Sequence, residues 1–317
     1  MRTTILLLSV DEAAMLEHSL PAAVAQGPGT EVVVIDNGCT DATSELAARH
    51  GAGILRLGSR HSYAAAMNYA IARTGGDAVL LLNADCFLAP GFVAAALPRL
   101  ANDGVGSVAP KLVRVSGPGV ELEQVDAAGM FIDRLRKNGL VGFGRPGREF
   151  SVPGECFGPD GAAALYRRRA LEDCALGQEV LDEDMELWAS DADLAWRAQL
   201  MGWRCAYEPG AVAGHIRTYS PATRSGISER DRQIQFRNRY LMMAKNETAA
   251  SLLRHGLWIA GYELLALGHV LLRERHLLKA YRQAGRMLPA ARRRRRLVQA
   301  RARVRVPPFG LRPSAGR

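Results

Sequence analysis

The chain has 317 residues, 48% of them hydrophobic, and a formal net charge of +9, so it can bury one large core or a core with a small accessory region. Its five cysteines are odd in number, scattered and without a C-x-x-C pair, which excludes a disulfide framework or a zinc site and indicates a reducing cytoplasm. The amino terminus leads at once into an apolar run, so no signal peptide is expected.

The first 85 residues alternate between predicted strands and helices. Short apolar runs predict strands at residues 3–8, 31–36, 54–57 and 79–82. Amphipathic stretches, ended by glycines after the second and third, predict helices at residues 11–26, 42–50 and 63–73. This alternation is typical of a parallel, doubly wound sheet with right-handed crossovers. No G-x-G-x-x-G follows the first strand, so a dinucleotide-binding loop is not expected.

Polar side chains follow two of these strands. Asp36 ends the second strand, and Asn83 and Asp85 end the fourth. Open α/β sheets bind ligands at the carboxyl ends of their strands, and two oxygen-bearing side chains one residue apart can hold a hard divalent cation. Such a cation can in turn hold a diphosphate. The structural alternative is a polar turn in which Asp85 caps the next element.

The second half of the chain carries another acidic group. Residues 116–156, with eight glycines, predict an irregular or hairpin-rich insert. An amphipathic helix follows from Ser190 to Gly202, with Asp191 and Asp193 in its first turn. Taken by themselves, these residues favour helix capping over catalysis, because Ser190 is a good N-cap and Asp193 could complete a capping box. His215, after the next strand and a Glu-Pro-Gly turn, is either a metal ligand or a strand-end histidine.

Taken together, these motifs resemble the inverting family-two glycosyltransferases. The resemblance covers residues 3–245 and rests on five blocks in the family order: residues 33–41, Asn83-Ala-Asp85, residues 157–168, residues 190–197, and the Gly-Trp-Arg at 202–204 with the distal His215. It implies an A-type glycosyltransferase fold, a Rossmann-like, mostly parallel sheet flanked by helices, with C-terminal helices. The Arg237-Asn-Arg239 sequence, with asparagine first in the tripeptide, is similar to the bacterial rhamnosyltransferases.

The resemblance implies a site for a nucleoside-diphosphate sugar. Asp36 would bind the base, beside the backbone around Ser9. Asn83 would lie over the ribose or the donor sugar. Asn68, on the helix at residues 63–73, would face the donor, although a solvated helix face explains that position equally well.

The resemblance also implies the reaction. Asp85 and His215 would bind Mg²⁺ or Mn²⁺ at the diphosphate, and Asp191 would be the catalytic base. In a single displacement the acceptor hydroxyl loses its proton as it attacks the anomeric carbon, so a positioned carboxylate accelerates the step about 10²–10⁴-fold. One carboxylate base suffices, because the cation stabilises the departing diphosphate. The acceptor would be a glycan or a lipid-linked sugar.

Three positions depart from the family pattern. Asn83 replaces a first aspartate, Ser190 replaces the glutamate before the base, and Ser62 replaces a glycine. The departures at Asn83 and Ser190 leave a catalytically silent sugar-nucleotide-binding protein as one alternative. A sugar nucleotidyltransferase is another, but the sequence after the first strand, Ser9-Val-Asp-Glu-Ala, is not the glycine-rich basic loop that this class needs.

The C-terminal region differs in composition from the rest. Residues 252–278 are largely apolar, and residues 275–317 contain thirteen arginines, one lysine and no acid, so the first 274 residues carry about −5. We therefore divide the chain into a catalytic domain at 1–245 (nucleotide-sugar half 1–115, acceptor half 116–245), an amphipathic helical region at 246–290 and a flexible basic tail at 291–317.

An apolar helix pair followed by a basic tail predicts peripheral binding to the anionic inner face of the cell membrane. Glu263 interrupts the longest apolar run, which disfavours a transmembrane span. Helices packed on the body with a solvated tail are the alternative. Binding to nucleic acid ranks third, because the arginines lack interleaved aromatic residues.

Overall fold

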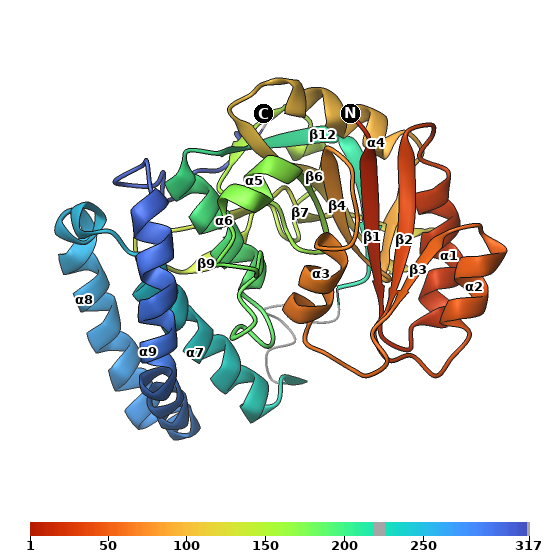
Figure 1. Cartoon of the computed structure of the whole chain (residues 1–317). Coiled ribbons are helices and arrows are strands. Elements are labelled where there is room, and N and C mark those ends of the chain that lie inside the picture. Colours follow the sequence, from red (N-terminus) through yellow and green to blue (C-terminus); the bar gives the residue numbers. More distant parts are fainter. Residues whose placement is uncertain (218–225, 316–317) are drawn as a thin grey trace.

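The computed structural model describes residues 1–217 and 226–315 (Figure 1). Its centre is a mixed sheet in the order β10-β12-β6-β11-β4-β1-β2-β3, with β5 beside β12 and β7 beside β6. The strands are β1 Thr3–Ser9, β2 Thr30–Asp36, β3 Gly53–Arg56, β4 Ala78–Asn83, β5 Cys86–Leu88, β6 Val105–Gly117, β7 Val120–Ala127, β10 Gly154–Cys156, β11 Ala163–Arg167 and β12 Arg204–His215. A separate hairpin pairs β8 (Met130–Ile132) with β9 (Asn138–Leu140).

The four amino-terminal strands are parallel, as their unbroken apolar runs predict. Helices α1 (Ala13–Val24), α2 (Thr43–Arg49) and α3 (Tyr63–Ile71) connect them. The register aligns Leu8 of β1 with Asn83 of β4, and Ser9 with Asp36 of β2. The carboxyl ends of these strands therefore lie at one edge, and the predicted alternating α/β fold is confirmed.

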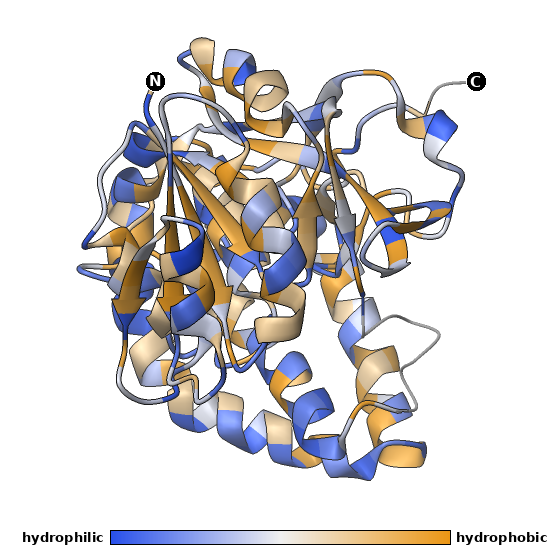
Figure 2. Ribbon diagram, turned by 90° about the vertical axis from the view of Figure 1, so that its right-hand side faces the viewer, coloured by the Kyte–Doolittle hydropathy of each residue, from blue (hydrophilic) through white to orange (hydrophobic). Residues whose placement is uncertain are grey.

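Side chains alternate between the two faces of the sheet. Ile5 and Leu7 belong to one buried cluster, with α1, α2 and α4 (Phe92–Ala96), whereas Leu6 and Leu8 belong to another, with α3, α5 (Arg168–Asp173) and α6 (Ser190–Met201). Figure 2 shows that the strands between these layers are largely hydrophobic and that the surrounding helices are mixed. Because both faces are covered, the central strands need no polar alternation.

The second half of the chain extends this sheet. β11 is antiparallel to both β4 and β6, and β12 returns parallel to β6. The predicted Glu-Pro-Gly turn is instead a bulge within one long strand, where the β12–β6 register shifts between Glu208 and Val212. The predicted hairpin-rich insert is present as the β6–β7 and β8–β9 pairs.

Three long helices form the C-terminal part: α7 (Glu229–Asn246), α8 (Ala249–Leu272) and α9 (Leu278–Arg301). In Figure 1 they lie side by side at the edge of the molecule remote from β3. Side-chain caps start two of them, with Ser228 accepting from the amide of Asp231 and Thr248 from that of Ser251, each at 3.1 Å. By length and composition, α8 is the single helix among the described residues that could cross a membrane.

The prediction of a flexible tail from residue 291 is wrong, because this part of the chain is ordered on the body of the protein. Residues up to Arg301 continue α9, and the segment after it packs back on the body. The Phe309 ring stacks on Phe157 at 5.8 Å and meets Trp196 edge-on at 5.3 Å, and the amide of Gly310 donates to Ile132 at 2.7 Å. Burial of these aromatic surfaces offsets the chain entropy that a basic composition alone suggested would keep the segment loose.

A buried network of charges joins α7 to α6. Lys245 of α7 is fully buried and bonds Asp182 and, at 2.8 Å, the Oδ2 atom of Asp193. Arg197 donates to the same Asp193 oxygen at 2.9 Å, and Asn246 donates to Oδ1 at 2.7 Å. The end of α7 is therefore part of the core that holds α6, although residue 245 was the predicted domain boundary.

This network predicts that Lys245→Met will be strongly destabilising, because it leaves Asp182 and Asp193 with less compensating charge in the interior. We expect a loss of about 3 kcal/mol in the free energy of unfolding, measured by urea denaturation. The exposed Lys279→Met is the matched control and should change stability by less than about 0.5 kcal/mol. Similar denaturation midpoints for the two variants would show that the network does not stabilise the fold.

Candidate functional site

A cavity of about 320 Å³ lies at the carboxyl end of β4, between the starts of α3 and α6. Asn83, Asp85, Asp191 and His215 all line it, although they come from three separate parts of the chain. A second cavity of about 240 Å³ adjoins it at the ends of β1 and β2 and shares Tyr63, Asn83 and Asp85 as lining residues. The two cavities together have the size of a site for a small organic ligand.

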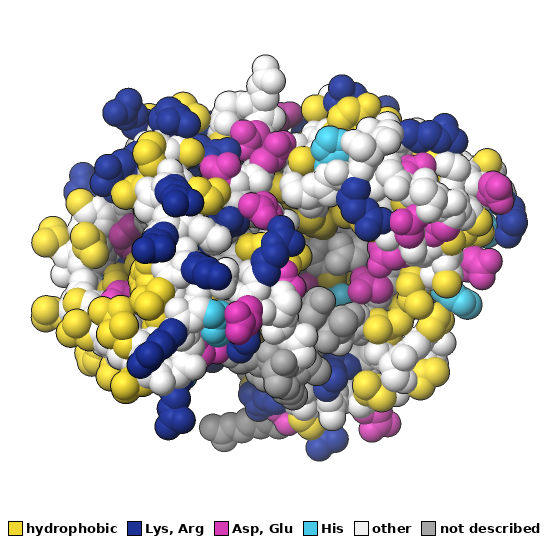
Figure 3. All heavy atoms as spheres, turned by 90° about the horizontal axis from the view of Figure 1, so that it is seen from below, with side chains coloured by type: hydrophobic (Ala, Val, Ile, Leu, Met, Phe, Trp, Pro, Cys, Tyr) yellow, Lys and Arg dark blue, Asp and Glu magenta, His cyan; other side chains and the backbone are white. Residues whose placement is uncertain are grey.

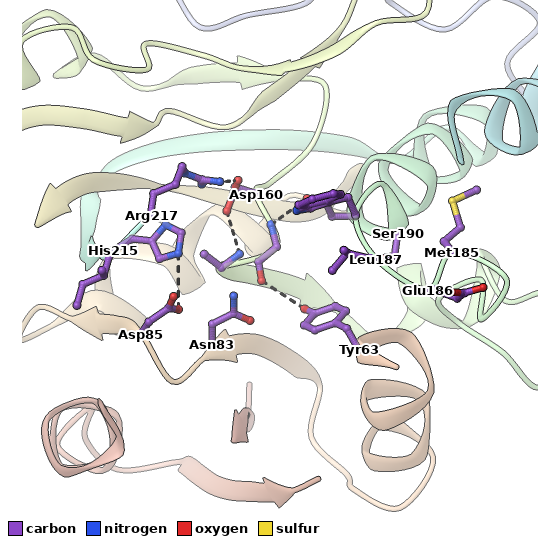
Figure 4. A pocket seen from close by; sticks show the side chains of 15 residues that line it. Tyr63, Asn83, Asp85, Asp160, Met185, Glu186, Leu187, Ser190, His215 and Arg217 are labelled. Carbon is purple, nitrogen blue, oxygen red and sulfur yellow. Dashed lines mark hydrogen bonds and ion pairs between the residues drawn. The ribbon is translucent and has the colours of Figure 1, made fainter. Parts of the chain in front are cut away.

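Asp85 and His215 face each other at one end of the larger cavity (Figure 4). β5 pairs with β12 so that His215 lies opposite Cys86, which brings its Nε2 atom to 3.6 Å from Oδ1 of Asp85. That carboxylate oxygen is buried and has no hydrogen-bond partner among the residues that the structure describes. The Nδ1 atom of His215 lies 2.8 Å from Oδ2 of Asp126. When Nδ1 carries the hydrogen, Asp126 orients the ring and leaves Nε2 free toward Asp85, the arrangement of a metal-binding histidine.

The protonation of this pair follows from its surroundings. Burial raises the pKa of Asp85, because the charged carboxylate is poorly solvated there. Burial alone would lower the pKa of His215, but the hydrogen bond and charge of Asp126 raise it above its usual value. The site therefore favours a positive charge between Asp85 and His215, which either a proton or a cation can supply.

Arg217 connects the histidine to a second buried carboxylate. Its guanidinium donates to both oxygens of Asp126 at 2.7 Å and to Oδ2 of Asp160 at 2.9 Å. Figure 4 shows Arg217 and Asp160 above the Asp85–His215 pair. Asp126, Asp160 and Arg217 were not among the site residues predicted from the sequence. Asp160 lies in a motif that carried the resemblance, but Asp126 lies in the glycine-rich insert, where no local signal marks it.

Asp191 lies in the first turn of α6 and borders the cavity. Its Oδ2 atom accepts from the amide of Gly161 at 3.2 Å, and its Oδ1 atom from that of Ala192 at 2.8 Å. Burial, assisted by the negative charge of Asp160, raises the pKa of Asp191 to about 6. A carboxylate with such a pKa is a stronger base than an ordinary aspartate and is still ionised at neutral pH.

Helix capping does not explain this acidic group. The N-cap of α6 is Ala189, which makes no side-chain cap, and Asp193 bonds Lys245 and Arg197 rather than closing a capping box with Ser190. Trp188 and Ala189 have φ angles of 59° and 63°, in the left-handed region. Such conformations cost on the order of 1–3 kcal/mol each for residues other than glycine and tend to occur at functional sites.

The structure does not bring Asn68 to the cavity. This side chain is buried and clamps the loop before α6: it accepts from the amides of Val180 and Leu181 at 3.0 and 2.9 Å and donates to the Leu181 carbonyl at 2.8 Å. The expectation that Asn68 faces the donor is therefore wrong. It lies on the inward side of α3, where an amide can satisfy an irregular loop.

Ser9 and Asp36 also lie outside the residues that line the two cavities. The Ser9 hydroxyl is buried 2.9 Å from that of Thr43. Asp36 accepts from the amide of Cys39 at 2.8 Å and from the Ser44 hydroxyl at 3.1 Å, which holds the turn after β2. The neighbouring Asn37, which the sequence analysis did not select, does line the smaller cavity. The nucleotide-binding roles of Ser9 and Asp36 remain predictions.

The fold is that of the A-type glycosyltransferases, a mostly parallel central sheet flanked by helices with additional C-terminal helices. The sequence profile of glycosyl transferase family 2 matches residues 4–175, more than half of the chain. The chain therefore belongs to glycosyl transferase family 2, as its motifs predicted. No curated protein sequence is significantly similar to the chain.

Solved glycosyltransferase structures share this fold at low sequence identity. GalNAc-T7 with UDP, GalNAc and Mn²⁺ has a TM-score of 0.61 and 14% identity over 77% of this chain, which spans only 47% of that structure. Residues 1–349 of S. aureus TarS with UDP-GlcNAc have a TM-score of 0.57 and 15% identity, covering 95% of this chain and 91% of TarS. The mannosyltransferase PcManGT of Pyrobaculum calidifontis with GDP-Man and Mn²⁺ has a TM-score of 0.51 and 18% identity, covering 95% and 85%.

The environment of Asp191 predicts that its replacement by asparagine will stabilise the protein at neutral pH, whereas the loss of a helix cap would destabilise it. Its pKa is about 6 in the folded protein against 3.8 without the protein environment, so the folded state binds the proton more tightly and loses stability as pH rises from about 4 to 6. Asp191→Asn should therefore be more stable than the parent by about 3 kcal/mol above pH ~7, with no gain near pH ~4. Urea denaturation at both pH values measures this, and a less stable variant at neutral pH would indicate a capping role.

Proposed function

We propose that the protein is an inverting glycosyltransferase that moves a sugar from a nucleoside-diphosphate sugar to a lipid-linked or cell-envelope glycan. The observation that carries the proposal is one cavity with two carboxylates that have different neighbours, Asp85 beside His215 and Asp191 at the start of α6. Two carboxylates with different neighbours in one site can each have its own chemical role. Because it would act on lipid-linked or cell-envelope glycans, the enzyme would be a peripheral protein at the cytoplasmic face of the cell membrane.

The residues at one end of the cavity fit Mg²⁺ or Mn²⁺. The Oδ1 atom of Asp85, which has no hydrogen-bond partner in the described part of the chain, and the Nε2 atom of His215 would hold the cation. Asp126 keeps the imidazole in the required orientation. When bound, such a cation neutralises negative charge that develops on the departing diphosphate. The Mn²⁺ in the GalNAc-T7 and PcManGT structures and the nucleotides or nucleotide sugars in all three relatives support this assignment.

In the proposed reaction, Asp191 is the general base. An acceptor hydroxyl forms a bond to the anomeric carbon, its proton passes to the Asp191 carboxylate, and the bond between the anomeric carbon and the diphosphate oxygen breaks with both electrons going to the diphosphate. Attack from the face opposite the diphosphate inverts the configuration. The hydrogen bond from the amide of Gly161 fixes the carboxylate for this proton transfer.

The donor is proposed to be a nucleoside-diphosphate rhamnose. Met185, Leu187 and Ile216 are apolar members of the lining of the larger cavity, which suit the methyl group of a 6-deoxysugar better than a hydroxymethyl group. The Arg237-Asn-Arg239 sequence and the asparagine at position 83 support the same branch. Asn83 borders both cavities, consistent with its proposed contact with the ribose or the donor sugar.

A donor screen tests the proposal. Thymidine, uridine and guanosine diphosphate sugars are added with Mn²⁺ in a thermal-shift assay, and release of nucleoside diphosphate is then measured with the donors that bind. We expect slow release by hydrolysis. Exchange with pyrophosphate would indicate a nucleotidyltransferase, and binding without release would indicate a catalytically silent protein, the reading that the departures at Asn83 and Ser190 favour.

Asp191→Asn should retain the donor-induced thermal shift while diphosphate release falls at least about a hundredfold, because the base is lost and the donor contacts remain. In the parent protein the rate should fall about tenfold per pH unit below pH about 6, where Asp191 becomes protonated. The pH–rate profile measures this limb. A variant with unchanged specific activity would assign the base to another residue.

Removal of the metal should abolish diphosphate release, and added Mg²⁺ or Mn²⁺ should restore it. Asp85→Ala should reduce activity more than His215→Ala, because the aspartate supplies charge as well as a ligand atom. Isothermal titration with Mn²⁺ alone gives a readout that is independent of turnover. Full activity in excess chelator would contradict the metal assignment.

A further inference from the structure

One face of α8 consists of exposed leucines with no protein partner among the described residues. We call it the α8 leucine face, and its most exposed members are Leu253 (89%), Leu257 (91%), Leu264 (73%), Leu265 (75%) and Leu272 (79%). They recur at helical spacing along the whole length of the helix. A continuous apolar stripe of this size is unusual on the surface of a monomeric soluble protein and indicates a binding surface.

The opposite side of α8 is fixed to the body. Ile259 and Val270 are buried, and Glu263 accepts from Arg239 at 2.6 Å and from the Tyr240 hydroxyl at 2.5 Å. Glu263 is the only Asp, Glu, Lys or Arg between residues 255 and 272. Since it points toward α7, the leucine face itself is free of charge from Leu257 to Leu272.

Cations surround this apolar face. Figure 3, seen from below, shows hydrophobic side chains at the side occupied by α8 and α9, with many Lys and Arg side chains among them. On the body side, Arg134 lies 3.9 Å above the Trp258 ring and Lys137 lies 5.6 Å from the Tyr262 ring. At the ends of α8 and the start of α9 the exposed cations are Arg254, Arg273, Arg275, Lys279, Arg282 and Arg286.

We propose that the α8 leucine face docks on an anionic lipid bilayer, with α8 lying along the membrane surface. The leucines enter the acyl region, the aromatic rings lie at its boundary, and the surrounding cations contact the lipid phosphates. A transmembrane passage of α8 would expose the Arg239–Glu263 pair to lipid, which is unfavourable. This deepens the proposed function, because it provides a way to reach a lipid-linked acceptor.

Only part of the C-terminal arginine set is available for lipid. Arg294 binds Glu179, Asp182 and Asp184, and Arg295 donates to backbone carbonyls at the end of α7. Removing the C-terminal segment would therefore damage the fold as well as the charge. Point variants at exposed positions are needed to test the surface.

The test measures binding of the full chain to vesicles by co-sedimentation. Parent protein should bind phosphatidylglycerol–phosphatidylcholine vesicles, and bind pure phosphatidylcholine less. Leu257→Gln/Leu264→Gln should weaken binding at least about tenfold, both at low salt and at about 0.5 M NaCl. Lys279→Gln/Arg282→Gln should remove mainly the salt-sensitive part. Val120→Gln/Leu122→Gln, which changes two exposed apolar residues of β7, is the matched control and should bind like the parent.

Equal vesicle binding by the parent and the leucine variant would overturn the proposal. So would a parent dimer in analytical ultracentrifugation that the leucine variant abolishes, since a second copy would then cover the face. Neither measurement depends on turnover. The proposed docking surface can therefore be disproved while the proposed glycosyl transfer stands, and the glycosyl transfer can be disproved while the docking surface stands.

A second inference concerns Asn238, in the Arg237-Asn-Arg239 sequence of α7, which the proposed chemistry does not use. Asn238 is fully buried, and its Nδ2 atom donates to the carbonyls of Leu187 and Trp188 at 2.8 and 3.1 Å. Its Oδ1 atom accepts from Arg237 at 2.9 Å, and Arg237 itself donates to the Asp184 carbonyl at 3.1 Å. Both side chains thus hold the loop that forms the cavity wall.

The hydrogen bonds of Asn238 lie directly before the proposed base in the chain. They hold the backbone at residues 187–188, just before Asp191, where Trp188 and Ala189 adopt their left-handed conformations. A strained turn persists only where its surroundings hold it in place. We infer that Asn238 is a positioning residue, which fixes this turn and thereby the orientation of the proposed base. The expected effect of Asn238 on the reaction rate rests on the proposed function.

Asn238→Asp tests this inference, because it replaces the amide donor by a carboxylate facing two carbonyls. Gln199→Glu is the matched control, since Gln199 is a buried amide at the other end of α6 that donates to the Phe157 carbonyl at 2.9 Å. In Asn238→Asp, amides of residues 188–192 should exchange hydrogen at least about tenfold faster than in the control. Diphosphate release should fall at least about tenfold with the donor-induced thermal shift unchanged.

An unchanged rate of amide hydrogen exchange in Asn238→Asp would overturn the inference that Asn238 holds this turn. Faster exchange with an unchanged release rate would show that Asn238 supports the loop without positioning the base. If the parent protein releases no diphosphate from any donor, the proposed function fails, while the exchange measurement still decides whether Asn238 holds the turn.

Discussion

The site depends on the neutralisation of two buried carboxylates by one guanidinium. Asp126 and Asp160 lie in the interior at the end of the sheet, and Arg217 bonds both of them. Each carboxylate then acts on a different part of the cavity: Asp126 orients His215, while the charge of Asp160 helps to raise the pKa of Asp191. Without Arg217, two negative charges would remain in a region that solvates them poorly, and both halves of the site would lose their support.

Helix α7 holds together the elements around the cavity, as Arg217 holds together the two buried carboxylates. Along one helix, Asn238 bonds the loop before α6, Arg239 bonds Glu263 of α8, and Lys245 bonds Asp193 within α6. The proposed base and the proposed membrane surface are therefore attached to the same rigid element. This arrangement suits an enzyme whose acceptor is held at a bilayer, because the orientation of the bound enzyme would also fix the direction of its cavity.

The similarity of this chain to solved glycosyltransferase structures is a similarity of fold. Three glycosyltransferase structures share the fold at 14–18% identity, so the likeness concerns the sheet and its helices. The side chains around the cavity include two departures from the family pattern, Asn83 in the tripeptide and Ser190 before Asp191. Neither departure removes the two carboxylates or the histidine that line the cavity.

The sequence by itself determined the alternating strands and helices, because apolar runs and glycine stops are local signals, and its motifs indicated the family and the residues Asp85, Asp191 and His215. Tertiary structure decided which polar side chains reach the cavity: Asn68 turns to a loop more than a hundred residues away, and Asp126 joins His215 across a similar distance. It also decided the fate of the basic tail, whose composition predicts disorder although Phe309 packs against the core. Contacts between distant segments depend on how strands and helices stack, and no local pattern of residues encodes that stacking.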